Sequence, residues 1–232
     1  MTERGKFIVL EGIDGSGKRT QMEMLLASLT SRGIACTQVS FPRYSGFFGK
    51  MVAQYLNGEF GALESVDAHF SALLYAGDRL EAKEMISSEL AKGSTVLADR
   101  YIGSNLAHQG ARVPAERREG FLRWLEKLEY EVYELPVEDL VIYLRVPAAE
   151  AQRLVSRKGE REYTKRQRDL QEENLAHLEA AAAVYDELAR GANWVKIECY
   201  DAKRQALRTP EEIHREVEGT VEARLGVKRA AR

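Results

Sequence analysis

Gly12, Gly17 and Lys18 have the spacing of a phosphate-binding loop. The segment GIDGSGKRT, residues 12–20, places four residues between two glycines and a lysine directly after the second glycine. Glycines let backbone N–H groups turn toward phosphate oxygens, and the lysine adds a positive charge. The next residue is normally Ser or Thr, whose hydroxyl binds Mg²⁺, but here it is Arg19. The sequence therefore predicts a nucleotide phosphate site that holds its metal in another way, with a plain glycine turn as the alternative.

Further charged residues occur in segments that follow predicted strands. FPRYSGFFGK (41–50) and DRYIGSNLAHQG (99–110) each follow a strand, and RLVSRKGEREYTKRQR (153–168) has seven basic and two acidic residues. By itself the last segment is equally typical of a solvated helix face or loop. Together with Lys18, Arg43, Arg79 and Arg100, however, it supplies more positive charge than one nucleoside triphosphate needs. This pattern favours two phosphorylated substrates and a phosphoryl transfer, which depends mainly on positioning and charge neutralisation.

The elements that must position these residues alternate along the chain. Short apolar runs predict strands, and longer segments with helical spacing predict helices between them. Most runs lack alternation, which is typical of strands buried on both faces. We therefore predict an α/β fold: a doubly wound, five-stranded parallel sheet flanked by helices, with ligands at the carboxyl edge of the strands. The predicted strands are 7–10, 36–40, 94–98, 140–144 and 194–197, and the predicted helices are 18–31, 65–91, 116–133 and 169–190.

Composition narrows the class of protein. The 232 residues are 44% hydrophobic and 30% charged, with a net charge of -2, which gives no indication of nucleic-acid binding. No apolar run is long enough for a membrane span, and two cysteines are too few for a disulfide framework, which favours a cytoplasmic location. We predict one domain, residues 1–225, with a short mobile lid at about 153–168, followed by a basic tail, 226–232.

Five motifs give the chain a specific resemblance. EGIDGSGK, FPRY, LLYAGDR, DRYIGSN and DLQEENL occur in an order and spacing that resemble those of the thymidylate kinases, P-loop members of the nucleoside-monophosphate kinase group, over residues 6–200. The resemblance implies transfer of the γ-phosphoryl group of ATP to dTMP, giving ADP and dTDP, with Mg²⁺ as cofactor. It also implies a homodimer formed through helices that include residues 65–91.

The resemblance assigns roles to the phosphate region. Lys18, Asp14 and Arg100 are implied to be catalytic, and Asp14 would also organise the acceptor phosphate and its metal. Mg²⁺ would be held by Asp14, Asp99 and Glu172, an all-oxygen ligand set that suits this ion. Asp99 and Arg100 could instead form a strand-end ion pair, and Glu172 could be part of an acidic first turn of a helix. The residues implied to bind ATP are Gly12, Gly15, Ser16, Gly17, Lys18, Arg19 and Thr20.

A second set of residues is implied to bind dTMP. Tyr75 would stack on thymine, and Arg79, one helical turn later, would bind the base from the same helix face. A core aromatic is the alternative reading of Tyr75. His108 departs from the aromatic residue that the family usually has beside the deoxyribose. The implied acceptor residues are Asp14, Phe41, Pro42, Arg43, Tyr75, Arg79, Arg100, Asn105 and His108.

Two features of the phosphate region remain open. Gly15 and Ser16 leave the loop without the arginine that one branch of the family has there, so the resemblance points to a lid arginine instead. Arg161 is the first candidate and Arg157 the second, because they flank the segment KGE. Arg19 would add a fixed charge, because Thr20 lies about 100° further round the helix and is a poor substitute ligand. A kinase for dUMP or UMP, or a nucleotide-dependent switch protein, are the alternatives to dTMP phosphorylation.

Overall fold

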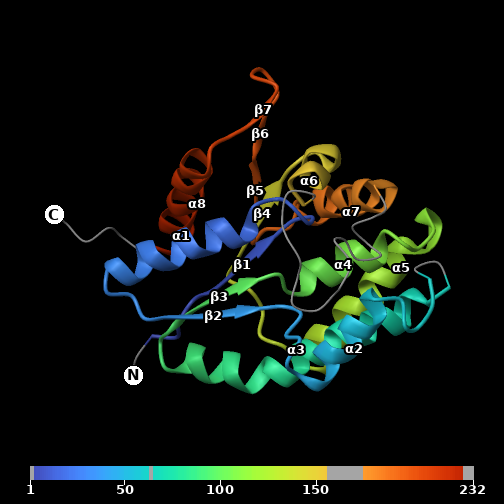
Figure 1. The fold of residues 1–232 in the computed structure, drawn as a ribbon. Coiled ribbons are helices and arrows are strands. Elements are labelled where there is room, and N and C mark those ends of the chain that lie inside the picture. Colours follow the sequence, from blue (N-terminus) through green and yellow to red (C-terminus); the bar gives the residue numbers. More distant parts are fainter. Residues whose placement is uncertain (1–2, 63–64, 156–174, 227–232) are drawn as a thin grey trace.

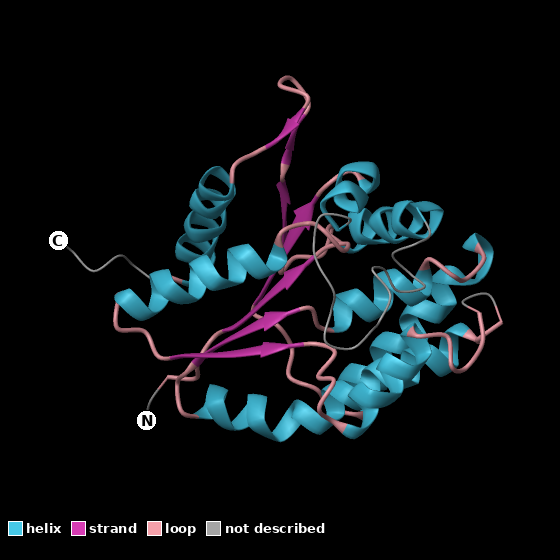
Figure 2. Cartoon of the chain, in the orientation of Figure 1, coloured by secondary structure: helices cyan, strands magenta, loops and turns pink. Residues whose placement is uncertain are grey.

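A five-stranded parallel sheet forms the centre of the molecule (Figures 1 and 2). The computed structural model describes residues 3–62, 65–155 and 175–226. The strand order is β2-β3-β1-β4-β5, with parallel pairing throughout. The predicted fold class is confirmed, and each predicted strand lies within one residue of the observed bounds. These are β1 (Phe7–Glu11), β2 (Cys36–Ser40), β3 (Thr95–Asp99), β4 (Leu140–Arg145) and β5 (Trp194–Glu198).

Helices cover both faces of the sheet, as Figure 2 shows. On one face, α1 and α8 pack together. The other face is covered by α3, α4 and α5. The helices are α1 (Lys18–Ser31), α2 (Phe47–Leu56), α3 (Ala68–Ala91), α4 (Ile102–Gly110), α5 (Ala115–Glu126), the π-helix η1 (Lys127–Val132), α6 (Ala148–Val155), α7 (Leu175–Leu188) and α8 (Pro210–Leu225).

The packing of the central strand β1 explains why apolar and polar residues do not alternate along it. Ile8 and Leu10 face a core shared with α1, α7 and α8, whereas Phe7 and Val9 face a core shared with α3, α4 and α5. Successive side chains on a strand point to opposite faces, so a strand covered on both sides is apolar at every position. The whole of β1 is buried, which fixes its carboxyl end, and hence the loop after it, firmly in the middle of the sheet.

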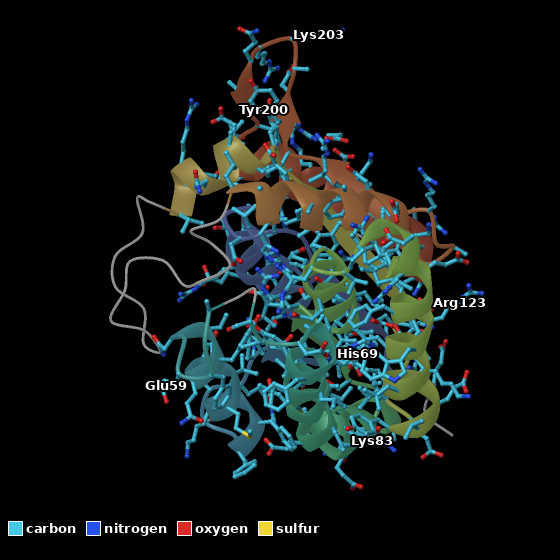
Figure 3. The ribbon with its side chains drawn as sticks, turned by 90° about the vertical axis from the view of Figure 1, so that its right-hand side faces the viewer. Glu59, His69, Lys83, Arg123, Tyr200 and Lys203 are labelled. Atoms are coloured by element: carbon cyan, nitrogen blue, oxygen red, sulfur yellow. The ribbon has the colours of Figure 1, made fainter. Side chains whose placement is uncertain are left out.

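Several elements differ from the sequence-based expectation. Helix α3 begins at Ala68 rather than at residue 65, because the Asp67 carboxylate accepts a hydrogen bond from the His69 N–H and caps the helix there. The helix predicted at 116–133 ends as an α-helix at Glu126 and continues as η1. Helices α2, α4, α6 and α8 were not predicted, nor was the hairpin of β6 (Tyr200–Asp201) and β7 (Ala206–Leu207), which protrudes beyond the sheet (Figures 1 and 3).

The topology sets the position of the ligand site. Helix α1 follows β1 on one face of the sheet, whereas α4 follows the adjacent strand β3 on the other face. A crevice opens between two neighbouring strands whose connections leave in opposite directions. No helix in the described ranges is long and apolar enough to cross a bilayer.

Candidate active site

The loop between β1 and α1 has the backbone shape that a phosphate cradle requires. Gly15 has φ +84°, and a Cβ there would lie 2.2 Å from the Ala151 carbonyl oxygen, so no larger residue fits. Gly17, with φ +88°, is the N-cap of α1 and has open space beside it. The first-turn amides of α1, from Lys18 to Thr20, have no intrahelical acceptor and are available to an anion at the helix N-terminus.

Lys18 lies folded under this loop. Its Nζ donates to the carbonyl oxygens of Gly12 and Ile13, both at 2.9 Å, and only 6% of the residue is exposed. Burial, together with the nearby charge of Arg100, lowers the pKa of Lys18 to about 8, although Asp14, Asp99 and Glu11 oppose the shift. A buried cation that has only weak partners is strongly stabilised by an anion. The Lys18 ammonium group is therefore well placed to bind a phosphate group.

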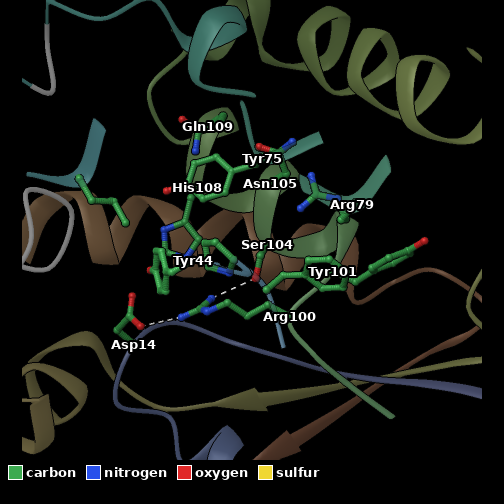
Figure 4. A pocket seen from close by; sticks show the side chains of 13 residues that line it. Asp14, Tyr44, Tyr75, Arg79, Arg100, Tyr101, Ser104, Asn105, His108 and Gln109 are labelled. Carbon is green, nitrogen blue, oxygen red and sulfur yellow. Dashed lines mark hydrogen bonds and ion pairs between the residues drawn. The ribbon is translucent and has the colours of Figure 1, made fainter. Parts of the chain in front are cut away.

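Arg100 joins the phosphate loop to α4. Its Nη2 donates to Asp14 Oδ1 at 2.7 Å, and its Nη1 donates to Ser104 Oγ (Figure 4). Nη1 also donates to the Gly12 carbonyl oxygen. Burial would lower the pKa of Arg100, but the surrounding carboxylates, Asp14 above all, raise it well above the usual range. The backbone of Arg100 has φ +67°, an uncommon value for a non-glycine residue that turns the chain sharply after β3. The guanidinium is therefore a fixed, permanent charge.

Two acidic side chains face the same cavity as Lys18. Asp14 and Asp99 line it together with Gly15, Gly17, Lys18, Arg19, Phe41 and Arg100; we call it the loop cavity. Asp99 Oδ1 is buried and makes no hydrogen bond within the described part of the chain. Mg²⁺ in phosphate sites commonly takes one or two carboxylates, with phosphate oxygens and waters completing the shell. The two carboxylates fit that ion.

A second cavity adjoins the loop cavity and shares Asp14, Phe41 and Arg100 with it. We call it the acceptor cavity (Figure 4). Aromatic rings form much of its wall, with polar groups from α3 and α4 between them. Tyr75 contributes to this wall and meets the Tyr55 ring edge-on at 6.4 Å. The lining residues are Asp14, Phe41, Pro42, Tyr44, Leu56, Tyr75, Arg79, Arg100, Tyr101, Ser104, Asn105, His108 and Gln109.

Arg43 lies outside both linings. Its backbone N–H and its Nε donate to the buried Asp78 carboxylate, at 2.8 and 3.3 Å, and its Nη2 lies 3.3 Å from Glu81 Oε2. Burial raises the pKa of Asp78, which Arg43 only partly offsets. Through Asp78, helix α3 thus binds the segment that follows β2 at Arg43. The next residue on α3, Arg79, lines the acceptor cavity, so the same turn of the helix positions both the segment and one wall of the cavity.

His108 lines the acceptor cavity as a neutral ring. Burial and the charge of Arg100 lower its pKa well below the usual value. Its Nδ1 lies 3.4 Å from His177 Nε2, and its Nε2 is buried with no hydrogen-bond partner within the described ranges. A neutral imidazole here can present one nitrogen to a ligand without adding charge.

Some predicted residues lie apart from the cavities or outside the described ranges. The Arg19 side chain is 81% exposed and pairs with Glu23 at 3.0 Å, although the residue borders the loop cavity. Thr20 is exposed on the next position of α1. The roles predicted for Arg157, Arg161 and Glu172 concern residues outside the described ranges, as do most of the predicted lid and the tail 227–232.

The sequence analysis did not identify several buried residues that position the site through hydrogen bonds. Glu11 is fully buried at the end of β1, where it accepts bonds from the backbone N–H groups of Tyr101 and Ser104 and from the hydroxyls of Ser104 and Tyr185. A charged residue in an apolar strand was the signal that could have revealed it. Tyr44, Tyr101 and Ser104 lie inside the motifs already noted, but Glu129 has no local signal at all.

Comparisons with known proteins agree on one family. A family model described as thymidylate kinase matches residues 10–214. Thymidylate kinase of Mycobacterium tuberculosis is 31% identical over 194 residues, covering 82% of this chain and 90% of the relative. The human thymidylate kinase is 34% identical over 149 residues, 64% of each chain. A solved thymidylate kinase from Candida albicans superimposes with a TM-score of 0.76 at 20% identity, covering 98% of this chain and 96% of that one.

Proposed function

Because the chain belongs to the thymidylate kinase family, we propose that its two adjoining cavities catalyse transfer of the γ-phosphoryl group of ATP to dTMP. The protein is a nucleoside-monophosphate kinase, and its products are dTDP and ADP. The observation that carries the assignment of sites is the shared wall of the cavities, where Asp14 and Arg100 are linked at 2.7 Å. Phosphoryl transfer needs the two substrates to meet head to head at such a wall.

The loop cavity is proposed to hold the ATP phosphates. The amides at the start of α1 and the Lys18 ammonium would bind the phosphate oxygens, replacing the contacts that Lys18 makes with Gly12 and Ile13. Asp14 and Asp99, with Glu172 from sequence, are the proposed carboxylates around Mg²⁺, which supplies charge neutralisation at the phosphates. Arg157 or Arg161 is proposed to add a further positive charge at the transferred group.

The acceptor cavity is proposed to hold dTMP. Tyr75 supplies a ring for stacking on thymine, and Arg79 and Asn105 supply polar groups for the base edge. Arg100 reaches the phosphate end, where it meets the loop cavity. His108 lies on the same wall and is proposed to lie against the deoxyribose.

A substrate panel tests the proposal most directly. The protein would be incubated with ATP and Mg²⁺ and with dTMP, dUMP, UMP or dCMP in turn, and diphosphate formation measured by chromatography. We expect dTMP to give the highest kcat/KM and omission of Mg²⁺ to abolish turnover. Binding of ATP without transfer to any monophosphate would instead indicate a nucleotide-dependent switch.

The pKa of Lys18 predicts a pH dependence of ATP binding. Because this pKa is lowered to about 8 in the free protein, the side chain is charged below pH 8 and loses its proton above it. Bound polyphosphate favours the charged form, so binding above pH 8 must take up a proton, and affinity should fall by up to about tenfold per pH unit.

Calorimetry between pH 7 and 9.5, in buffers of different ionisation enthalpy, measures both effects. Lys18→Met, which has no titratable group at this position, is the matched control and should lack the extra proton uptake. An affinity of the parent protein that stays constant from pH 7 to 9.5 would contradict the assignment of Lys18 to the ATP phosphates.

We also propose that the protein forms a homodimer through α3. Phe70, Leu73 and Leu80 form an apolar stripe on this helix, each more than a third exposed, while Asp78 and Arg79 face inward from the same helix. Burying such a stripe against a second copy would stabilise both the dimer and the acceptor cavity behind it. Sedimentation analysis of the parent and of Leu73→Glu checks this, since a parent that stays monomeric at micromolar concentration refutes it.

A cytoplasmic location is proposed from the cysteines. Cys36 and Cys199 are both free thiols, and burial raises the pKa of Cys199 to about 12, which leaves it unreactive. Fractionation of expressing cells with an antibody to the protein would test this location.

A further inference from the structure

We propose that Glu129 is a positioning residue that makes the acceptor cavity select a pyrimidine with an oxygen at C4 over one with an amino group there. Glu129 lies in η1, fully buried, and does not line the cavity itself. It acts through two residues that do line it, Arg79 and Asn105. The inference rests on the proposed function, because it concerns how the same cavity distinguishes pyrimidine bases.

The Glu129 carboxylate binds both of these residues. Arg79 donates to it through two nitrogens, from Nε to Oε2 at 2.5 Å and from Nη2 to Oε1 at 2.6 Å, and Asn105 Nδ2 donates to Oε1 at 2.9 Å. Burial would lower the pKa of Arg79, but Glu129 raises it, so the guanidinium stays charged. An ionised carboxylate only accepts hydrogen bonds, so all three contacts run in one direction.

This direction fixes the amide of Asn105. The second hydrogen on Nδ2 is donated to the Ala72 carbonyl oxygen at 3.0 Å, so both amide hydrogens are used. Reversing the amide would set Oδ1 against two acceptor oxygens and lose both bonds. As held, Oδ1 is buried with no hydrogen-bond partner in the described part of the chain, while Asn105 lines the cavity. A donor on a ligand in this cavity would satisfy that oxygen, which is otherwise left without a partner.

Arg79 provides the opposite group beside it. Its Nε and Nη2 are bound to Glu129, and within the described residues its Nη1 makes no hydrogen bond. Arg79 and Asn105 lie on the same wall of the cavity, where Figure 4 shows them close together. Nη1 can then donate to the ligand next to an acceptor, Asn105 Oδ1.

This pair matches one class of base edge. A pyrimidine with an oxygen at C4 presents that oxygen as an acceptor and N3–H as a donor, which complements Nη1 and Oδ1. A 4-amino pyrimidine such as cytosine presents the reverse, an amino donor and an N3 acceptor, and would leave buried groups facing like groups. A site that complements one arrangement of donors and acceptors strongly rejects a base with the reverse arrangement, because the mismatched buried groups then have no hydrogen-bond partner.

Glu129→Gln tests the proposal while keeping the size of the side chain. A glutamine amide both donates and accepts, so it no longer holds Asn105 in one orientation or pairs fully with Arg79. We expect the KM for dTMP to rise about tenfold and the ratio of kcat/KM for dTMP over dCMP to fall by about tenfold or more, the effect of one buried polar mismatch. The kcat for dTMP and the KM for ATP should change by less than about threefold, because the loop cavity is untouched.

Glu138→Gln is the matched control. Glu138 is equally a buried carboxylate of this region, bonded to Tyr130, but it lines neither cavity. This variant should keep the parent's preference for dTMP, so any general effect of losing a buried carboxylate is separated from positioning. Melting temperatures of the parent and both variants are measured alongside.

The possible outcomes distinguish a failure of this inference from a failure of the proposed function on which it rests. If the parent does not prefer dTMP, the proposed function fails before any variant is compared. If the parent prefers dTMP and folded Glu129→Gln keeps the parent's dTMP to dCMP ratio, Glu129 does not set the polarity and the inference is overturned. Should Glu129→Gln fail to fold, Glu129→Asp keeps the charge but shortens the reach. It should then lower the same ratio at least about threefold, and an unchanged ratio overturns the inference equally.

Discussion

Lys18→Ala is expected to lower turnover by about 10³-fold or more, with the protein still folded. The Nζ lies under the phosphate loop, bonded to the carbonyl oxygens of Gly12 and Ile13 and excluded from water. In such a site a positive charge stabilises the charge that develops on the transferred phosphoryl group far more than it would in solvent. Loss of the ammonium should therefore lower kcat more than it weakens dTMP binding.

The same burial predicts that this loss does not destabilise the free protein. Since the folded pKa, about 8, lies below the ordinary value, the charged lysine costs the folded state free energy at neutral pH. This cost disappears as the pH rises from 8 toward the unfolded pKa. Lys18→Met keeps the apolar stem and removes the charge, so at pH 7 it should melt at or above the parent's temperature while showing the same loss of turnover.

Single-turnover kinetics and thermal melts, run on the parent and the two variants, measure these effects. Lys203→Ala is a matched control, because Lys203 lies at the exposed end of the β6–β7 hairpin (Figure 3) and lines neither cavity. Turnover near that of the parent in a folded Lys18→Ala protein would rule out the assignment of the loop cavity to ATP.

The sheet was predictable from sequence because its signal is local. The central strands β1, β3 and β4 are short apolar runs that are buried on both faces, whereas β2 and β5 are partly exposed but are still short and contain β-branched residues. Helix α4 was missed for a physical reason. Helix α4 is only Ile102–Gly110 and carries Ser104, Asn105 and His108 for the site, so its buried face does not read as an apolar stripe.

The candidate site was partly predictable because its position follows from the predicted sheet. Residues of the loop and of the segments after β2 and β3 meet because the carboxyl ends of neighbouring parallel strands share an edge. The partners that hold them come from elsewhere in the chain: Asp78 for Arg43, Glu129 for Arg79 and Asn105, and Glu11 for Ser104. These contacts span up to 93 positions and depend on how helices pack, which no local pattern encodes.

Arg100→Ala is expected to lower kcat by about 10²- to 10³-fold, with a smaller effect on ATP affinity. Arg100 is the one basic residue that lines both cavities among the residues the structure describes. Its guanidinium is held by Asp14, by Ser104 and by the Gly12 carbonyl oxygen. Because it is already oriented, no free energy is needed to reorient it during phosphoryl transfer. A charge fixed between the two phosphate groups can offset their repulsion as they approach.

The planar fork of Arg100 matters as well as its charge. Nη1 and Nη2 bind different partners, and a lysine has one point charge that cannot serve both. Arg100→Lys should therefore recover only part of the lost turnover, whereas added guanidinium ion should partly restore Arg100→Ala by filling the vacated position. Arg118→Ala is the control, since Arg118 is also partly buried but bonds the Gly110 carbonyl oxygen and lines neither cavity. A folded Arg100→Ala protein whose kcat stays within about threefold of the parent would show that this charge is structural, and the meeting point of the substrates would then have to lie away from Asp14 and Arg100.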